Sequence, residues 1–442
     1  MTMNYAVHTI VLACLTLTSM ASAQERQAFL NARVIPVTSP TIENGYVLVE
    51  DGRITNVGSM ADWPVDDLPA TTQDCSGRII MPGLVCTHSH IGIWGTGGGG
   101  ADRSGPIQPE VRILDSIDVN NSGFRRAVAG GLTCLNIMPG SGHLSSGQTA
   151  YVKLRPATRI EDMVILDENG RPMGGLKMAN GTNSHRDPPF PGTRGKSAAL
   201  VRQAFIDAQE YQRKLQEAGD DPEKRPDRDL KMEALVEVLN GDRMVHHHTH
   251  RHDDILTVLR LSKEFGFRVV LHHASDGWKV ADEIAAAGAP CSLILIDSPG
   301  GKQEAVDLSY DTGKVLADAG AVISYHTDDL ITDSRWFRRM PALAMRAGLD
   351  EQTALESLTI NGAAMLDLDD RIGSLEPGKD ADLVILDGDP FSIYTRTLQT
   401  WIEGRKVFDL ENPEDRLYAV GGMGAGQPQR PYLCCIDEGH HH

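Results

Sequence analysis

The sequence has few cysteines and few aromatic residues. Its seven cysteines include no Cys-x-x-Cys pair. This excludes a disulfide-dense scaffold, and we expect most of the cysteines to be small buried apolar residues. Aromatic residues make up 5% of the chain. Because no aromatic stripe marks an interface, the sequence leaves a homo-oligomer open without predicting one.

Positive charge is also in deficit. The chain has 42 lysines and arginines against 60 aspartates and glutamates, which gives a net charge of −18. A chain this acidic has no general attraction to nucleic acid or to an anionic membrane, so we expect neither as a partner. What remains is a globular composition, with 41% hydrophobic residues. A length of 442 residues fits one barrel of roughly 250 residues plus a smaller domain.

The first residues have the pattern of a targeting segment. An apolar run, Thr9 to Leu17, precedes Ala21-Ser22-Ala23, a small-x-small cleavage signature. The run is too short to span a membrane. We therefore predict a signal peptide over residues 1–23 and a periplasmic or secreted protein. A frayed amphipathic N-terminus and a lipoprotein signal cut before Cys14 are the alternatives. At the other end, residues 433–442 form a tail whose last three histidines resemble the remnant of a purification tag.

The pattern of predicted strands, turns and helices changes twice along the chain. Residues 24–80 and 367–432 contain short strands and tight turns, and together they predict one small β-sandwich built from both ends. Between them, over 81–366, strands and helices alternate, which predicts an α/β protein with a (β/α)₈ TIM barrel. A polar segment, 181–228, is expected to place a helix, Ala198–Leu215, above the barrel. Gly97–Gly100 is expected to be a loop after an early strand.

Two histidine clusters follow predicted strands. His88-Ser89-His90 ends an apolar run, and residues i and i+2 of a strand point to the same side. Two imidazoles at the carboxyl end of a barrel strand make a natural metal pair. The second cluster, 246–252, holds five histidines in seven residues. Such a row is costly unless it binds something, although a solvated histidine-rich edge is the alternative.

Two further clusters lie downstream. His272 and His273 are adjacent on a strand, so we expect only one of them to face the barrel interior. Asp328, two residues after His326, could be both metal ligand and proton carrier, although paired acids also begin helices. From His248 to His273 is about one βα unit of roughly 30 residues, and Asp328 follows about two units later. This spacing places the clusters on strands five, six and eight if His88 marks strand one.

Several motifs together resemble those of a known family. Met81-Pro82-Gly83-Leu84 leads into the first histidine pair, and the later segments 358–364 (LTINGAA) and 373–382 (GSLEPGKDAD) complete the pattern. From Phe29 to about Asp409 the chain resembles the amidohydrolase superfamily, in its imidazolonepropionase-like and prolidase-like branch. The resemblance implies a barrel with metal at its mouth. It maps the ligands to His88, His90, Lys177, His248, His273 and Asp328.

Two residues of this sequence are candidates for the lysine in that set. Prolidase-like relatives carry a carboxylated lysine that bridges two metals, and Lys177 is the best match, with Lys153 as runner-up. Either could be a surface lysine. The resemblance thus implies two Zn²⁺ ions bridged by carboxylated Lys177, with another divalent metal as an alternative. Imidazolonepropionase itself lacks this lysine and holds one metal.

The expected chemistry is hydrolysis of an amide or peptide-like carbon–nitrogen bond by metal-activated hydroxide. Asp328 is expected to shuttle the proton, and His250 is a second catalytic candidate. Arg251, Tyr151 and Arg155 are candidates for binding a small-molecule or short-peptide substrate, as in a dipeptidase or carboxypeptidase. The rivals are a mononuclear cyclic-amide hydrolase, a deaminase and a metal-binding protein without activity.

Overall fold

The structure is a computed structural model that describes residues 26–64, 68–69, 71–93, 100, 102, 104–295, 302–329, 331–422 and 425. The predicted signal peptide, most of the Gly97–Gly100 loop and the C-terminal tail with Cys434 and Cys435 lie outside these residues. Among the helices of the described part, none combines the length and apolarity that crossing a bilayer requires.

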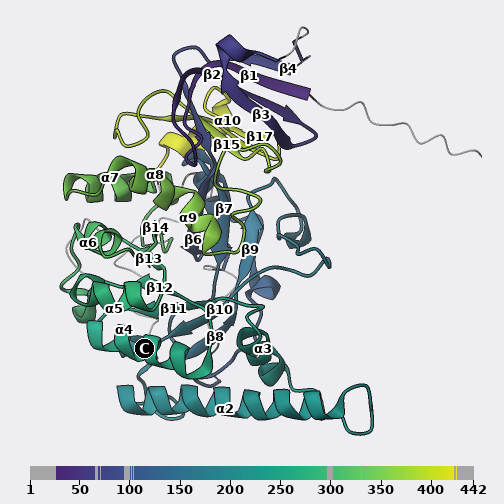
Figure 1. Ribbon diagram of the computed structural model, residues 1–442, viewed down its shortest axis with the longest axis vertical. Helices are drawn as coiled ribbons and strands as arrows, with labels where there is room; N and C mark the ends of the chain where they lie inside the picture. Colours follow the sequence, from purple (N-terminus) through teal and green to yellow (C-terminus); the bar gives the residue numbers. More distant parts are fainter. Residues whose placement is uncertain are drawn as a thin grey trace, which may run out of the picture.

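The two ends of the chain meet in one sheet. Eight strands pair in the order β17-β16-β15-β5-β1-β2-β3, with β4 on β1. β5 and β15 join the two ends, because Leu383 pairs with Pro82 and Leu386 with Ile79. The pieces expected to form a sandwich therefore share a single hydrogen-bonded sheet, seen at the top of Figure 1. Its strands are β1 Arg26–Val34, β2 Ile42–Glu50, β3 Arg53–Ser59, β4 Thr71–Asp74, β5 Ile79–Pro82, β15 Leu383–Leu386, β16 Thr397–Ile402 and β17 Arg405–Asp409.

The middle of the chain carries the parallel strands. Five of them, β10 to β14, pair in sequence order, and β6 pairs with β7 in parallel. In the described residues these ladders form two sheets, and a parallel bridge from Ser89 to Asp329 connects them. In these two sheets β8 and β9 pair antiparallel with β10 and β7. The strands of the two sheets are β6 Leu84–Ser89, β7 Leu132–Ile137, β8 Ser145–Gln148, β9 Ala150–Lys153, β10 Leu176–Ala179, β11 Val245–Thr249, β12 Val269–His273, β13 Cys291–Leu293 and β14 Ile323–Tyr325. The fold is therefore mixed α/β, with parallel strands whose carboxyl ends carry the histidine clusters.

Helices follow these strands and cover the outside of the sheets (Figure 1). Capping residues explain their ends: Asn121 caps α1, and Gly266 ends α4 in the left-handed conformation at φ 76°. The helices are α1 Ser122–Ala129, α2 Arg194–Ala218, α3 Leu230–Leu239, α4 His252–Phe265, α5 Ala281–Ala286, α6 Thr312–Asp318, α7 Arg339–Arg346, α8 Glu351–Leu358, α9 Ile360–Ala364 and α10 Pro413–Val420.

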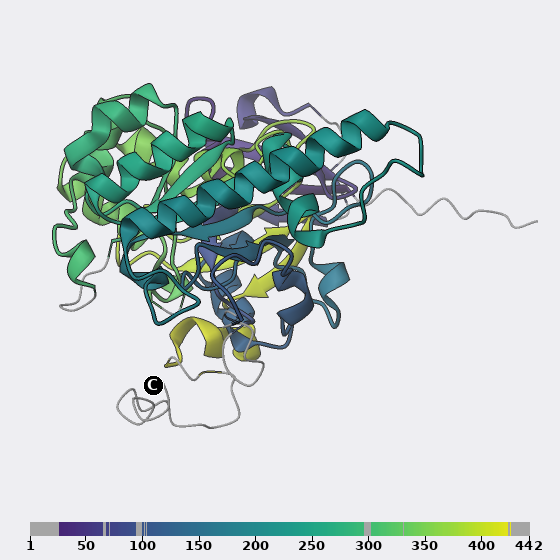
Figure 2. The same cartoon turned by 90° about the horizontal axis from the view of Figure 1, so that it is seen from below.

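The long helix α2 does not lie where the sequence suggested. It packs against α3 and α4 and crosses the outside of the molecule in Figure 2, rather than sitting above the barrel mouth. The reason is an apolar stripe on α2, in which Phe205 stacks on Phe265 and Phe267 at centroid distances of 5.2 and 5.0 Å. The part of the insertion that approaches the histidines is the short turn Gly181–Ser184 before the helix.

Candidate metal centre

Three donor atoms converge at the end of β6. The Nε2 atoms of His88 and His90 lie 3.3 Å apart, because the two residues share one side of the strand end. The His90 Nδ1–H group donates to the Met138 carbonyl at 2.7 Å, which directs Nε2 toward Asp328. Asp328 Oδ1 lies 3.0 Å from His90 Nε2 and 3.3 Å from His88 Nε2. These distances bring the predicted strand-one and strand-eight residues together.

Lys177 reaches the same point from β10. Its Nζ atom lies 3.1 Å from His88 Nε2 and 3.0 Å from Met138 Sδ, and the side chain is fully buried. Burial lowers the pKa of Lys177 to about 7, against an opposing effect of Asp328. Lys153 instead contacts Asp380 at 2.6 Å and Asp382 at 3.1 Å. The structure therefore places Lys177, and not the runner-up Lys153, among the histidines.

Both histidines at the end of β12 face the interior, so the expectation that only one would do so is wrong. The rings of His272 and His273 have their centroids 5.0 and 5.1 Å from that of His88. The reason is local: His273 has a φ of 69°, in the left-handed region, which ends the alternation of an extended strand. The sequence pattern carries no sign of this change.

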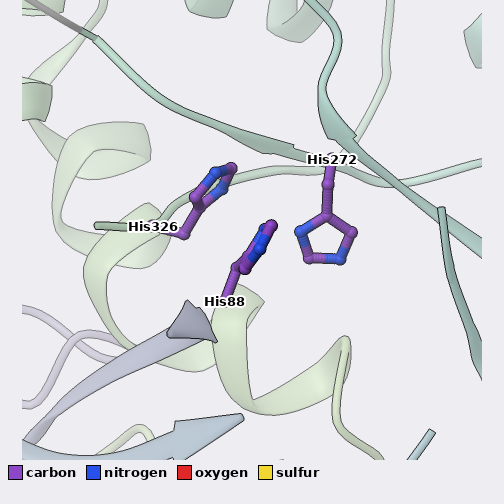
Figure 3. Close-up of side chains that lie close together, drawn as sticks. All are labelled: His88, His272 and His326. Atoms are coloured by element: carbon purple, nitrogen blue, oxygen red, sulfur yellow. The ribbon is translucent and has the colours of Figure 1, made fainter. Parts of the chain in front are cut away.

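His326 is a further histidine that the sequence analysis did not select. The ligand atoms of His88, His272 and His326 lie within 4.8 Å of one another, and the His88 ring lies between the other two in Figure 3. Ser292 Oγ contacts His326 Nδ1 at 2.7 Å and so orients the ring. Its position two residues before Asp328 was the available signal. A second group of the same size joins His88 with His273 and Asp328.

A third group lies on the side of β11. The ligand atoms of His248, His250 and Glu304 lie within 4.8 Å of one another. His248 belongs to β11, and His250 lies just after the end of this strand, two residues beyond His248. Glu304, in the short turn Gln303–Ala305, was missed, because no local motif marks it.

Burial keeps the histidines of these groups neutral. It lowers the pKa of His250 and His326 to about 3 and that of His88, His248, His272 and His273 well below the usual value. Burial raises the pKa of Asp328, but the hydrogen bond and charge of His90, with the charges of His326 and Lys177, bring it below the usual value. Neutral imidazoles beside one carboxylate are in the protonation states that bind a metal.

The donor atoms fit a divalent metal. Buried polar atoms normally have a hydrogen-bond partner, and leaving one without a partner is costly. Within the described part of the chain, five of these histidines have a buried ring nitrogen with no hydrogen-bond partner: His88 Nδ1, His248 Nδ1, His250 Nε2, His272 Nδ1 and His273 Nε2. Several imidazoles with a carboxylate form a donor set typical of zinc, and other divalent metals also accept it.

The three residues predicted to bind substrate have other partners. The Tyr151 hydroxyl contacts His246 Nε2 at 2.9 Å, and His246 Nδ1 contacts His272 Nε2 at 2.9 Å. Tyr151, on β9, thus contacts the histidine cluster through His246, near the start of β11. Arg155 pairs with Glu403 at 2.6 Å, and Arg251 pairs with Asp253 at 2.8 Å. Their roles in substrate binding stay predictions.

Comparisons with known proteins identify the class. A model of the amidohydrolase family matches residues 239–408. The chain is similar to the solved structure of an amidohydrolase from Thermotoga maritima MSB8, with 34% identity and a TM-score of 0.80, over 87% of this chain and 100% of that one. The chain therefore belongs to the amidohydrolase superfamily, as its motifs implied. The amidohydrolase homologues indicate a hydrolase acting on carbon–nitrogen bonds, in a metal-dependent superfamily whose members combine a TIM barrel with an additional domain.

More distant relatives show the range of the likeness. The amidohydrolase tasK of Hapsidospora irregularis is 30% identical over 83% of this chain, which spans only 40% of that relative's length. An imidazolonepropionase of Porphyromonas gingivalis is 25% identical over 77% of this chain and 82% of the relative. A prolidase solved with N-methylphosphonate-L-proline shares the fold, at 18% identity and a TM-score of 0.55.

Proposed function

We propose that the protein hydrolyses an amide or peptide-like bond with divalent metal held by His88, His90, Lys177, His248, His273 and Asp328. The observation that carries the proposal is the convergence of His88, His273 and Asp328, whose ligand atoms lie within 4.8 Å. The neutral state of the histidines supports it, since protonated rings do not bind metal. Zinc is the metal that this donor set favours.

Asp328 is the residue to which we assign proton transfer. A divalent ion bound in the centre would supply Lewis acidity, making water nucleophilic near neutral pH and polarising the scissile carbonyl. Asp328 Oδ1 faces the two histidines, so Oδ2 is the atom we assign to accept the proton of water and pass it to the leaving nitrogen. Its side chain is 18% exposed, so water can reach this carboxylate.

Lys177 is the residue to which we assign carboxylation. Its Nζ atom would attack carbon dioxide, form a new N–C bond and release one proton, which leaves a carbamate anion. Only the neutral amine can do this, and a pKa of about 7 makes a large neutral fraction available near neutral pH. The carbamate would supply the negative charge that two adjacent cations need between them. We therefore propose two ions rather than one.

The substrate class remains a proposal that follows from the relatives. A small amide or short peptide cleaved in a dipeptidase- or carboxypeptidase-like manner agrees with the predicted export to the periplasm or beyond, where peptides are available. The second candidate is a cyclic-amide hydrolase with one metal. The similarity to an imidazolonepropionase over 77% of this chain favours it specifically.

Metal analysis of the purified protein without its terminal histidines tests the proposal. We expect about two zinc ions per chain, a loss of metal in Asp328→Asn, and a ¹³C-bicarbonate-derived carbamate signal that disappears in Lys177→Ala. In a panel of dipeptides, N-acyl amino acids and cyclic amides, Asp328→Asn should lower kcat/KM by roughly 10²- to 10⁴-fold.

Two results would contradict it in different ways. A wild-type protein that binds no zinc and hydrolyses none of these compounds would refute the proposed function. One zinc per chain, unchanged by Lys177→Ala, would refute the carbamate and favour the cyclic-amide alternative.

A further inference from the structure

Lys302 is a cationic side chain that reaches the histidine centre from outside. It precedes the short turn Gln303–Ala305, and its Nζ atom lies 3.4 Å from His248 Nε2. Much of the side chain is exposed, so a substrate that enters from solvent can contact it. Lys302 forms no ion pair with any described residue. Arg194, which lies against the same turn, is by contrast paired with Asp254 at 2.9 Å.

A second donor approaches the same histidine nitrogen. Asn183 lies in the short turn before α2, and its Nδ2 atom is 3.2 Å from His248 Nε2. The backbone holds this turn against the segment of Lys302, because the Thr182 N–H group donates to Glu304 Oε2 at 2.9 Å. Thr182 and Glu304 are each within two positions of one of the donors. The fold therefore places an ammonium group and an amide together beside the centre.

His248 cannot satisfy both donors. A neutral imidazole has one nitrogen with a hydrogen and one with a lone pair, so His248 accepts from at most one of Lys302 and Asn183. A metal ion held by His248 would use that lone pair, because the ligand is the unprotonated nitrogen. The ammonium group and the amide would then both lack this acceptor. A carboxylate, with about four lone-pair positions on two oxygens, can accept from both.

The charges around these donors favour an anionic ligand. Glu304 is the neighbouring carboxylate, and Arg194 Nη2 lies 3.7 Å from its Oε2 atom, which partly balances its charge. The two arginines that the sequence suggested for substrate binding are already paired, Arg155 with Glu403 and Arg251 with Asp253. Lys302 is instead a cation whose charge has no paired carboxylate in the described residues.

We propose that Lys302 and Asn183 bind a carboxylate of the substrate, so that the protein selects amides of amino acids whose own α-carboxylate is free. The inference rests on the proposed function, because it names the substrate class of the same centre. Lys302 Nζ lies 3.4 Å from a proposed metal ligand, so the carboxylate that it binds must be close to the scissile bond. N-acyl amino acids and dipeptides meet this condition, whereas peptides with a blocked carboxyl end do not.

Matched substrates test the inference in the zinc-loaded, full-length protein. Each dipeptide and N-acyl amino acid is compared with its carboxamide, and the wild type should have a kcat/KM at least about tenfold higher on the free acid. Lys302→Met should remove most of this preference by raising KM for the acid, and Lys302→Arg should keep part of it. Asn183→Ala should lower the preference by roughly threefold to tenfold. Lys263→Met, at an exposed lysine of α4, is the matched control and should keep the wild-type preference.

Binding of the free amino acid product, by titration calorimetry, makes the same comparison without turnover. Lys302→Met should bind the amino acid at least about tenfold more weakly than the wild type does, whereas Lys263→Met should bind it equally well. Circular dichroism and elemental analysis check folding and zinc content in every variant. The ratio of kcat/KM for acid and amide does not depend on the fraction of active protein, so a partial loss of zinc does not imitate the expected result.

Two results would overturn the inference and leave the proposed function intact. In the first, the wild type cleaves the carboxamides as well as the free acids. In the second, Lys302→Met has the same preference for the acid as the wild type. A wild type that cleaves no compound of either series would instead overturn the proposed function, and the inference with it.

Discussion

Two fully buried lysines show how differently the same residue is used in this molecule. Lys153 on β9 and Lys177 on β10 are 1% and 0% exposed. Burial alone would lower the pKa of both, but Asp382, Asp380 and Glu403 together raise the pKa of Lys153. Lys177 contacts a histidine nitrogen and a methionine sulfur, and its pKa falls to about 7. A buried lysine paired with several carboxylates is a structural cation, whereas one whose pKa is lowered by burial, despite a nearby aspartate, is a reactive amine.

The partners of Lys153 also show what its charge holds together. Asp380 and Asp382 precede β15, and Glu403 lies between β16 and β17, so all three belong to the terminal sheet. Lys153 itself is the last residue of β9, in the α/β part of the chain. The cluster therefore ties the α/β part of the molecule to the sheet made by the two ends. Lys177 instead contacts His88 and Met138, and in the described residues it has no hydrogen bond to the terminal sheet.

The largest expected effect comes from making the same substitution at both lysines. Lys153→Met leaves the buried Asp382 carboxylate without its lysine partner, so the free energy of unfolding should fall by about 3–5 kcal/mol. Lys177→Met removes a desolvated amine, so the metal-free protein should be no less stable than the wild type. Urea unfolding of the two metal-free variants measures both values. Equal losses of stability in the two variants would show that both lysines are structural and would remove the contrast.

The same contrast marks the limit of what the sequence could predict. Lys153 follows Tyr151-Val152 and Lys177 follows Gly175-Leu176, and only the family resemblance ranked Lys177 first. Asp380, which decides the role of Lys153, lies 227 positions away along the chain. Glu304 was missed for the same reason, since a turn residue joins the histidines only through the tertiary fold. Long-range partners of this kind require the structure.

Local patterns were sufficient where strand geometry alone decides the outcome. The alternation of side chains predicted that His88 and His90 share one side, and the structure places their Nε2 atoms 3.3 Å apart. The turn-rich texture of both ends predicted that they belong together, and β5 pairs with β15. The pattern failed at His273, where a positive φ changes the direction of the side chain. The expectation that a helix of the polar segment lies above the barrel was also wrong, because the apolar stripe of α2 packs against α3 and α4 outside the sheets.

The second expected effect is an opposite pH dependence at the two lysines. The pKa of Lys177 is about 7 in the folded protein and higher in the unfolded chain. The unfolded state therefore binds more protons between these values, and the metal-free protein gains stability as pH rises. Lys153 has a raised folded pKa, so its contribution is complete below the unfolded value and is lost only at higher pH.

Urea unfolding at pH 7, 8 and 9 in bicarbonate-free buffer measures this difference. Between pH 7 and 9 the wild type should gain up to about 2 kcal/mol relative to Lys177→Met, because the variant has no amine to titrate. Lys153→Met should run parallel to the wild type over the same range. If the free energies of unfolding of the wild type and Lys177→Met change in parallel with pH, burial does not lower the pKa of the Lys177 amine.

The smallest effect is expected at Arg251, the exposed counterpart of these buried cations. Its guanidinium and the Asp253 carboxylate are 42% and 44% exposed, so solvent screens their pairing. Arg251→Ala should change the free energy of unfolding by less than about 1 kcal/mol and kcat/KM by less than about fivefold. Steady-state kinetics on the best amide of the panel, with Arg251→Lys as the control, checks this. A rise in KM of more than tenfold in Arg251→Ala, with kcat unchanged, would mean that the guanidinium leaves Asp253 to hold the substrate, as the sequence first suggested.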